Sequence, residues 1–352
     1  MKCLPFEGKK QYLNTYSKKN IQKYKKKVSN FLISKIINHY QIIFFLVLLL
    51  LIQVRHNISK ENFGLPMKSK INEITIKIVG TGNLFIVNDS FYQVPDSIYL
   101  YNFENCYERE TRSINIPTDG PTDNIVKIVW NQKLETLNIL FAGLLHLLEV
   151  DLSHLDTSSV TYMGDMFCGC QSLTSVNLAN LNTSLVENMR LLFCNCTSLA
   201  ELDLSSFDTS KVTDMDNMFS ECRNVKKLNL SHFDTSQVEN MKGMFYRMYG
   251  LEELDISHFD TSKVTYMNYM FYYCENLTSL DLSSFNTSSV VNMSAMFGDL
   301  HKIESINLSH FDTSQVVDME SMFLTMSSIK ELDLSNFDTS QVTNMCYMFS
   351  DC

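Results

Sequence analysis

The stretch LAELDLSSFDTSKVTDMDNMFSECRN, residues 199–224, is one copy of a 26-residue unit that recurs in constant register as far as residue 352. Eight units follow one another without insertion or deletion, and the last is two residues short. A unit of this length cannot bury its own apolar face, so stacked neighbours must supply the missing partner. The repeat therefore predicts a solenoid. The units begin at Leu147, Leu173, Leu199, Val225, Leu251, Leu277, Ile303 and Ile329.

The apolar residues of each unit follow two different periods. Positions 1, 4 and 6 are apolar, as Leu199, Leu202 and Leu204 are in the quoted copy, and this alternation predicts a short strand. Positions 14, 17, 20, 21 and 24 are also apolar, and these spacings fall on one face of a helix. We therefore expect an α/β fold, a solenoid of eight strand-turn-helix coils. The second-half residues of the quoted copy are Val212, Met215, Met218, Phe219 and Cys222.

The turn between the predicted strand and helix is the most constant part of the unit. Position 9 is Phe or Leu, position 10 is Asp or Asn, and positions 11 and 12 are Thr-Ser in all eight units. Thr or Ser ahead of a helix accepts a hydrogen bond from an unpaired backbone N–H, and Asp at position 10 closes a local Asx turn. A structural role is favoured over calcium binding, because the glycine-rich spacing of repeat calcium sites is missing. The aspartates considered for calcium are Asp156, Asp208, Asp234 and Asp260.

Sulfur-containing and aromatic residues recur on the predicted core face. Methionine at position 17 and phenylalanine at position 21 occur in all eight units and are expected to form core ladders. Position 24 is Cys in five units and Met or Leu in three, which favours buried free thiols; disulfides between coils stacked ~5 Å apart are the alternative. The Cys-x-Cys pairs at 168/170 and 194/196 lack the CxxC spacing of zinc sites, so no metal site is predicted. The position-24 cysteines are Cys170, Cys196, Cys222, Cys274 and Cys352.

Four units carry histidine at position 8, and two of these histidines stand in adjacent coils. A metal-binding or pH-sensing pair is one interpretation. Asn or Ser fills the same position in the other four units, which favours solvated turn residues. The four are His154, His232, His258 and His310.

The N-terminal segment differs sharply in charge from the rest of the chain. Ten lysines and a single acid, Glu7, precede residue 55, whereas the formal net charge of the whole chain is -10. The body of the protein is therefore acidic, which argues against a nucleic-acid partner. Residues 1–30 are lysine-rich and without period, a composition typical of disorder.

The unbroken apolar run IIFFLVLLLLI, residues 42–52, indicates export or membrane attachment. We expect residues 31–54 to form a signal-anchor with the N-terminus in the cytoplasm, because positive charge stays on that side. A cleaved signal peptide is the alternative, since a full span needs roughly 20 apolar residues. The repeats are accordingly expected at the cell surface, or secreted after cleavage.

A small module precedes the repeats. Residues 55–70 are expected to be a linker and residues 71–130 a β-rich N-terminal cap module. Subtracting one repeat length maps the apolar positions of the first unit onto residues 131–146, which we interpret as a degenerate first half-repeat ahead of the array at 147–352. The predicted strands of the cap lie within residues 74–78, 84–87, 97–103 and 125–130.

Asn-x-Ser/Thr sequons are frequent in the exported part of the chain. Several must arise by composition, because the repeat is rich in Asn, Ser and Thr. The candidates for glycosylation are Asn57, Asn88, Asn195 and Asn276.

No constellation of residues points to catalysis. A nucleophile elbow, a phosphate loop, a zinc-protease helix and a singular pair of carboxylates are all missing from the sequence. A catalytic residue should be singular, whereas the polar residues here are mostly periodic. We therefore expect no enzymatic activity, no metal and no cofactor.

The copies LDLSSFDTSKVTDMDNMFSEC, LNLSHFDTSQVENMKGMF and LDISHFDTSKVTYMNYMFYYC resemble the 26-residue surface-protein repeat of BspA-like leucine-rich-repeat proteins. The same repeat is known as a domain of unknown function in mycoplasmas. The resemblance covers residues 131–352, and FDTS followed by VxxMxxMF at fixed spacing is highly specific. It implies a leucine-rich-repeat-like solenoid on or outside the cell, with adhesion to host proteins or other cells as the usual proposal. The basic, anchor-like N-terminus departs from this pattern.

Together these features predict a non-enzymatic cell-surface module that binds an extracellular protein of a host or neighbouring cell. The alternative is a structural coat or spacer protein that assembles through its solenoid edges. Ligand contacts are expected at the strand-face positions 2, 3, 5 and 7, where an acidic face favours a basic partner; ordinary solvated strand residues are the other interpretation. The candidates are Glu201, Asp203, Lys226, Lys227, Asn229, Glu252, Glu253, Asp255, Asp281 and Asp333.

Overall fold

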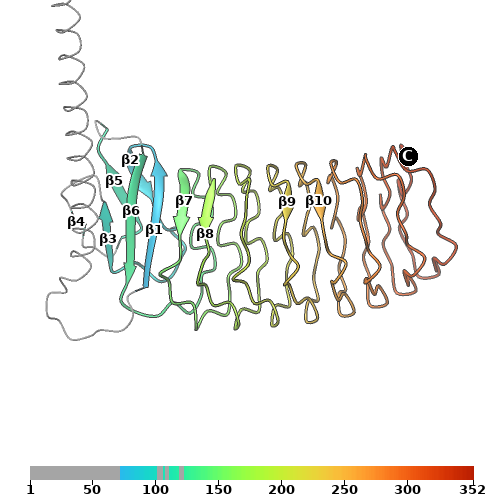
Figure 1. The fold of residues 1–352 in the computed structure, drawn as a ribbon, viewed down its shortest axis with the longest axis horizontal. Coiled ribbons are helices and arrows are strands. Elements are labelled where there is room, and N and C mark those ends of the chain that lie inside the picture. Colours follow the sequence, from blue (N-terminus) through green and yellow to red (C-terminus); the bar gives the residue numbers. More distant parts are fainter. Residues whose placement is uncertain (1–71, 101–105, 108–110, 119–122) are drawn as a thin grey trace, which may run out of the picture. The chain divides into compact units, whose positions relative to one another are not determined.

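The computed structural model describes residues 72–100, 106–107, 111–118 and 123–352, which all belong to one compact unit, Ser69–Cys352. Within it a β-sheet is continued by a stack of coils (Figure 1). The predicted basic tail, signal-anchor and linker lie outside the described residues. In the part of the chain that is described, no helix has the length and apolar character needed to cross a membrane.

The largest sheet joins the residues before the array to its first coils. It contains β1 (Asn72–Val79), β3 (Ser97–Leu100), β4 (Cys106–Tyr107), β6 (Asp123–Trp130), β7 (Leu147–Asp151) and β8 (Ser175–Asn177), in the order β4-β3-β6-β1-β7-β8. A separate antiparallel pair is formed by β2 (Gly82–Phe85) and β5 (Ser113–Ile116).

Strand β1 is the link between the two parts of this sheet. It pairs antiparallel with β6 on one side and with β7, the first strand of the array, on the other. The alternation that predicted this strand is present, since Ile74, Ile76 and Ile78 are buried and the residues between them are half-buried. From β7 onward the pairing is parallel, as it is between β7 and β8.

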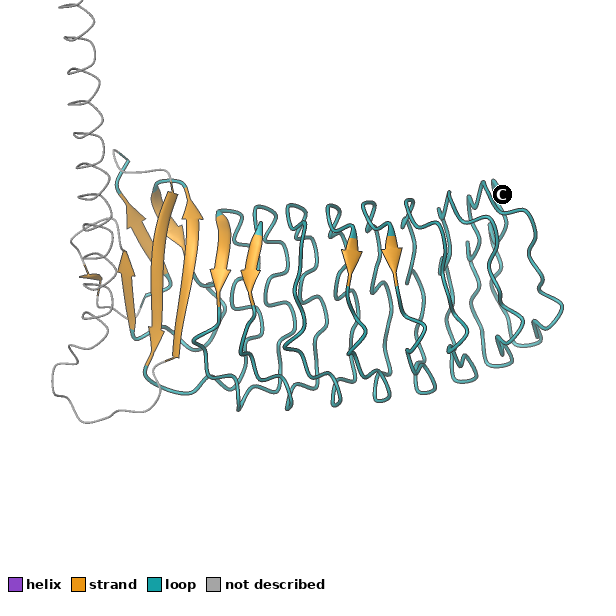
Figure 2. Cartoon of the chain, in the orientation of Figure 1, coloured by secondary structure: helices purple, strands orange, loops and turns teal. Residues whose placement is uncertain are grey.

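Along the array each coil repeats the path of the one before it (Figure 2). Single parallel bridges join position 16 of successive coils, from Thr136↔Tyr162 through to Asp318↔Asn344. Short strands are recognisable in some coils, including β9 (Lys227–Leu228) and β10 (Glu253–Leu254), which pair in parallel. Residues 134–144 follow the same path as the second half of a coil, with the Leu137 N–H donating to the Tyr162 carbonyl at 2.9 Å.

The predicted strand-turn-helix coil is wrong: none of the described residues forms a helix, and the second half of each coil is a run of turns (Figure 2). The fold is therefore a solenoid of strands and turns and not an α/β solenoid. At positions 19 and 23 the backbone is left-handed in every coil, with φ of 57° at Asp165 and 62° at Glu221, and a right-handed helix cannot pass through such residues.

Hydrogen bonding between coils explains why turns replace the helix. The backbone N–H groups at positions 17, 19, 21 and 23 donate to the next coil, as that of Asp165 does to the Arg190 carbonyl at 2.8 Å and that of Phe167 to the Leu192 carbonyl at 3.0 Å. The N–H at position 22 donates three residues back within the coil, as that of Cys168 does to the Asp165 carbonyl at 3.1 Å. Packed helices need an axial separation of about 8–10 Å, whereas this ladder keeps the second halves at strand spacing, about 4.8 Å.

The predicted core ladders of methionine and phenylalanine are confirmed. Met163 and its equivalents as far as Met319 are fully buried, as are Phe167 and its equivalents as far as Phe323. Successive phenylalanine rings stack nearly parallel, with centroids 5.4 Å apart for Phe167 and Phe193. This close stacking is possible because both halves of each coil keep the same short spacing.

Candidate functional site

The predicted ligand-binding face is exposed, but some of its charges pair with one another. Lys226 lies 3.1 Å from Glu252, and Lys227 lies 2.7 Å from Glu253, so the charges at positions 2 and 3 of these two adjacent coils pair with each other. Pairs this exposed contribute little to stability. They nevertheless leave fewer unpaired charges on the face than the sequence suggested. The remaining predicted residues, all exposed, are Glu201, Asp203, Asn229, Asp255, Asp281 and Asp333.

The Asp or Asn at position 5 has a structural role of its own. The Ser205 N–H donates to Asp203 Oδ1 at 2.9 Å, and the same Asx turn recurs at Asn229, Asp255, Asp281 and Asp333. Hydrogen bonds from the backbone N–H and the hydroxyl of the serine two residues on hold the pKa of the Asp203, Asp255, Asp281 and Asp333 carboxyls below the usual range. One carboxylate oxygen of each is therefore already committed to the backbone.

The Asp-Thr-Ser turn forms a ladder between coils at threonine. Thr209 is 1% exposed; its hydroxyl donates to the Asp234 carbonyl at 2.9 Å and accepts from the Asp234 N–H at 2.8 Å. The Asx turn predicted at position 10 is confirmed, since the Ser210 N–H donates to Asp208 Oδ1 at 3.0 Å. The predicted helix cap is not formed, because no helix follows.

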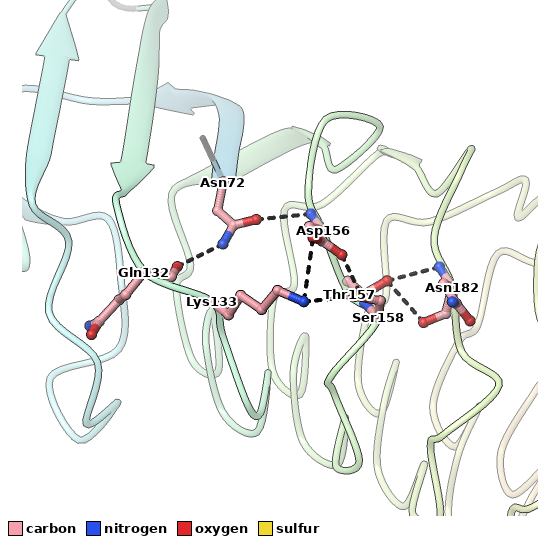
Figure 3. Close-up of polar contacts among 7 residues, drawn as sticks. All are labelled: Asn72, Gln132, Lys133, Asp156, Thr157, Ser158 and Asn182. Atoms are coloured by element: carbon pink, nitrogen blue, oxygen red, sulfur yellow. Dashed lines mark hydrogen bonds and ion pairs between the residues drawn. The ribbon is translucent and has the colours of Figure 1, made fainter. Parts of the chain in front are cut away.

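Asn72 completes this ladder at the side of the cap (Figure 3). The Asp156 N–H donates to Asn72 Oδ1 at 3.0 Å, and Asn72 Nδ2 donates to the Gln132 carbonyl at 2.7 Å. One coil further along, Thr157 receives the N–H of Asn182 at 2.8 Å. Asn72, which is 1% exposed, thus supplies to the first coil the acceptor that threonine supplies to each later one.

The position-8 histidines bond back to the scaffold. Nε2 of His232 lies 2.8 Å from the Leu204 carbonyl, and His258 and His310 make the equivalent contact with earlier coils. His154 contacts the Ser153 hydroxyl. All four are exposed turn residues, as favoured from the sequence. Among the described residues, no group of three or more His, Cys, Asp or Glu is arranged to hold a metal.

All five position-24 cysteines are free thiols; four of them are buried in the core, and Cys352 in the last coil is exposed. Cys170, Cys196, Cys222 and Cys274 are fully buried, and each donates to the carbonyl of a phenylalanine in the preceding coil, at 3.0 to 3.2 Å. Burial raises the pKa of the Cys170 and Cys222 thiols to about 12. These cysteines therefore have a packing role.

The side chains of two glycosylation candidates form hydrogen bonds to backbone carbonyls. Asn88 Nδ2 donates to the Ala142 carbonyl at 2.7 Å, and Asn276 Nδ2 donates to the Tyr249 carbonyl at 2.6 Å. Asn195 is half-buried, with a left-handed backbone. Asn57 lies outside the described residues. A glycan on Asn88 or Asn276 would require the hydrogen bond from that side-chain amide to break.

A surface that the sequence analysis missed lies at positions 19, 22, 23 and 25. Three successive coils replace small or polar residues at these positions with tyrosine and arginine. The signal was present in the sequence as a local departure from the repeat. We call this surface the tyrosine–arginine patch; it comprises Arg223, Tyr246, Arg247, Tyr249, Tyr269, Tyr272 and Tyr273.

The patch is held together by ring stacking and cation–π contacts. The Arg247 guanidinium lies 5.0 Å from the ring centroid of Tyr246 and 5.4 Å from that of Tyr273. Arg223 lies 5.5 Å from the ring of Tyr249. Glu221 forms ion pairs with both guanidiniums. The arginines and rings therefore hold one another in place.

Gly298 in the following coil makes room for one of these rings. A Cβ atom at this residue would come within 2.8 Å of the Tyr272 ring, so only glycine allows the ring to lie where it does. Tyr272 in turn stacks on Tyr246, with centroids 5.9 Å apart. Tyr269 is the outermost ring of the patch, at 38% exposure.

A family model described as "Mycoplasma protein of unknown function, DUF285" matches residues 123–228, 197–306 and 272–352. The three overlapping stretches together cover residues 123–352, which is more than half of the chain. No curated protein and no solved structure was found to match.

Proposed function

The chain belongs to the DUF285 family of mycoplasma proteins of unknown function, and on this premise we propose that it is a non-enzymatic cell-surface module that binds an extracellular protein. Its role is adhesion to, or recognition of, a host or neighbouring cell. The resemblance of the repeat to that of BspA-like surface proteins supports this role. The apolar run at residues 42–52 supports attachment through a signal-anchor, with the repeats outside.

The tyrosine–arginine patch is the observation that carries the proposal. The recurring residues of the coils have structural roles in core, ladder and turn, whereas the patch departs from the repeat and interrupts no ladder. Tyrosine and arginine are the residue types most enriched at the centres of protein interfaces. Because these side chains are already ordered by one another, little side-chain entropy is lost on binding.

The strand face has a smaller part in this proposal than the sequence suggested. Its lysine–glutamate pairs are satisfied within the chain, and its position-5 carboxylates bond to the backbone. Its remaining acidic groups favour a basic partner and increase the rate of association more than the lifetime of the complex.

The experiment measures saturable binding of the detergent-solubilised full-length chain to cultured host cells. The patch variant is Tyr246→Ser with Tyr269→Ser, because serine already occupies these positions at Ser220 and Ser321. Two interface tyrosines worth about 2 kcal/mol each predict a loss of affinity of about 100-fold or more. Tyr162→Asn, in a coil outside the patch, is the matched control and should bind as the unchanged protein does.

Reversing Glu252 and Glu253 to lysine tests the strand face separately. If this variant alone loses binding, the site moves from the patch to the strands. Concentration-dependent assembly without saturable binding would support a structural coat protein instead. Turnover of a substrate that one point substitution abolishes would contradict the non-enzymatic assignment.

A further inference from the structure

Two pairs of cysteines lie side by side in the first two full coils, one pair at position 22 and the other at position 24. The Gly143 N–H donates to the Cys168 carbonyl at 2.7 Å, and the Gly169 N–H donates to the Cys194 carbonyl at 2.7 Å, so the coils are held in register here. Hydrogen-bonded neighbours of this kind lie about 4.8 Å apart, within the Cα separation of about 4.4–6.8 Å that disulfides span. Backbone geometry therefore permits a bond within either pair.

The two pairs differ in their access to solvent. Cys168 and Cys194 are half-buried, whereas Cys170 and Cys196 are fully buried. The buried thiols donate to the carbonyls of Phe141 and Phe167, at 3.0 and 3.2 Å. Only the position-22 pair is open to a reagent in solution.

The two pairs also differ in reactivity. A hydrogen bond from the Cys194 thiol lowers the pKa of Cys168, and the positive charge of Arg190 acts in the same direction, against burial and Asp165. The same hydrogen bond, together with burial, raises the pKa of Cys194, which remains the thiol donor. Burial raises the pKa of both Cys170 and Cys196. Because the thiolate is the attacking species, Cys168 is the nucleophile of the four.

We propose that Cys168 and Cys194 form a thiol–disulfide exchange site that reacts with a low-molecular-weight disulfide. The Cys168 thiolate attacks one sulfur of that disulfide, forming a mixed disulfide and releasing the first thiol. Cys194 then gives up its proton and attacks the Cys168 sulfur, which releases the second thiol. One protein dithiol is oxidised and one small disulfide is reduced to two thiols.

The product is a covalent link across the first two coils, beside the cap. It closes the length of one repeat into a loop and constrains the unfolded chain. The proposal does not depend on the binding function, since it concerns a different part of the array. It predicts that the array is cross-linked in an oxidising environment and open in a reducing one.

The test treats the reduced, folded full-length chain with glutathione disulfide, blocks the remaining thiols and maps the cross-links by mass spectrometry after digestion. The expected product joins the peptides that carry Cys168 and Cys194. It should disappear in Cys168→Ser and in Cys194→Ser, which follow the natural Ser220 at this position. It should persist in the matched control with Cys170→Met and Cys196→Met, because Met248 and Met326 occupy position 24 elsewhere.

A second measurement does not require the cross-link to form. Under native conditions at pH 7, iodoacetamide should modify Cys168 at least about 10-fold faster than Cys170, because thiolate fraction and exposure both favour it. A stable glutathione adduct on Cys168 with Cys194 still reduced would overturn the proposal. So would a cross-link that survives Cys168→Ser, or equal alkylation rates in a chain whose circular dichroism shows it to be folded.

Discussion

Threonine at position 11 replaces a backbone group in the ladder between coils. The chain turns at this corner, and the N–H and carbonyl of Asp234 both bond to the hydroxyl of Thr209 in the coil before. A hydroxyl donates and accepts at once, which neither an ammonium group nor a carboxylate does. Serine has the same hydroxyl, but the methyl group of threonine also fills buried space, since Thr209 is 1% exposed.

Replacing Thr209 by valine should therefore destabilise the array strongly. Valine has the same shape but leaves the part-buried N–H and carbonyl of Asp234 without this partner, at an expected cost of about 2 kcal/mol in the free energy of unfolding. Thr209→Ser keeps both bonds and should lose less than half as much. Urea denaturation followed by circular dichroism measures both, with the exposed Thr278→Val as the neutral control. A loss for serine as large as that for valine would mean that the hydroxyl contributes no more to this corner than the methyl group does.

At the scale of the element, the sequence predicted which residues are buried better than it predicted the backbone that buries them. The spacing of Val212, Met215 and Phe219 is met by a helix and equally by alternating turns. The deciding feature is the left-handed residue at position 19, which is Asp165 in one coil, Leu191 in the next and Tyr269 in another. None of these three is glycine, the usual marker of that conformation; only Gly243 marks position 19, so the pattern gave little warning.

The candidate site was missed for a related reason. A search for periodic exposed charge leads to the strand face, because Asp203 and its equivalents recur there. The tyrosine–arginine patch is not periodic, and its members are neighbours only because positions 19, 22, 23 and 25 of successive coils meet on one side. Once the coil geometry is known, Arg247 and Tyr273 are seen to be in contact although a whole repeat separates them.

Strand β1 covers the open side of the first coil by pairing with β7. Asn72, at the start of β1, also bonds to Asp156 of that coil. Asn72→Ala would remove a buried amide that accepts from the Asp156 N–H and donates to the Gln132 carbonyl. We expect a loss of about 1–3 kcal/mol, localised to the first coil. Hydrogen exchange should therefore accelerate around residues 147–160 before it does around residues 251–264.

Asn115→Ala is the matched control for this variant, because Asn115 lies on β5 and its side chain is exposed. It should leave exchange in the array unchanged. Acceleration spread evenly over all coils would show instead that the array unfolds as a single unit, and that the cap does not protect the first coil in particular.

For the whole molecule, the uniform register means that stability should be the sum of each coil and its contacts with its two neighbours. Deleting residues 251–276 brings coil 225–250 against coil 277–302. Phe245 then stacks on Phe297, and Gly298 receives the ring of Tyr246 in place of Tyr272. The shortened chain should fold, with a thermal midpoint only a few degrees lower.

Deleting residues 251–263 removes half as many residues but places two second halves in succession. The strand and the threonine of one coil are then lost, and every ladder between coils is interrupted there. This smaller deletion should be far more damaging, with loss of cooperative unfolding measured by circular dichroism. If the two deletions were equally harmful, contacts beyond nearest neighbours would have to hold the coils together.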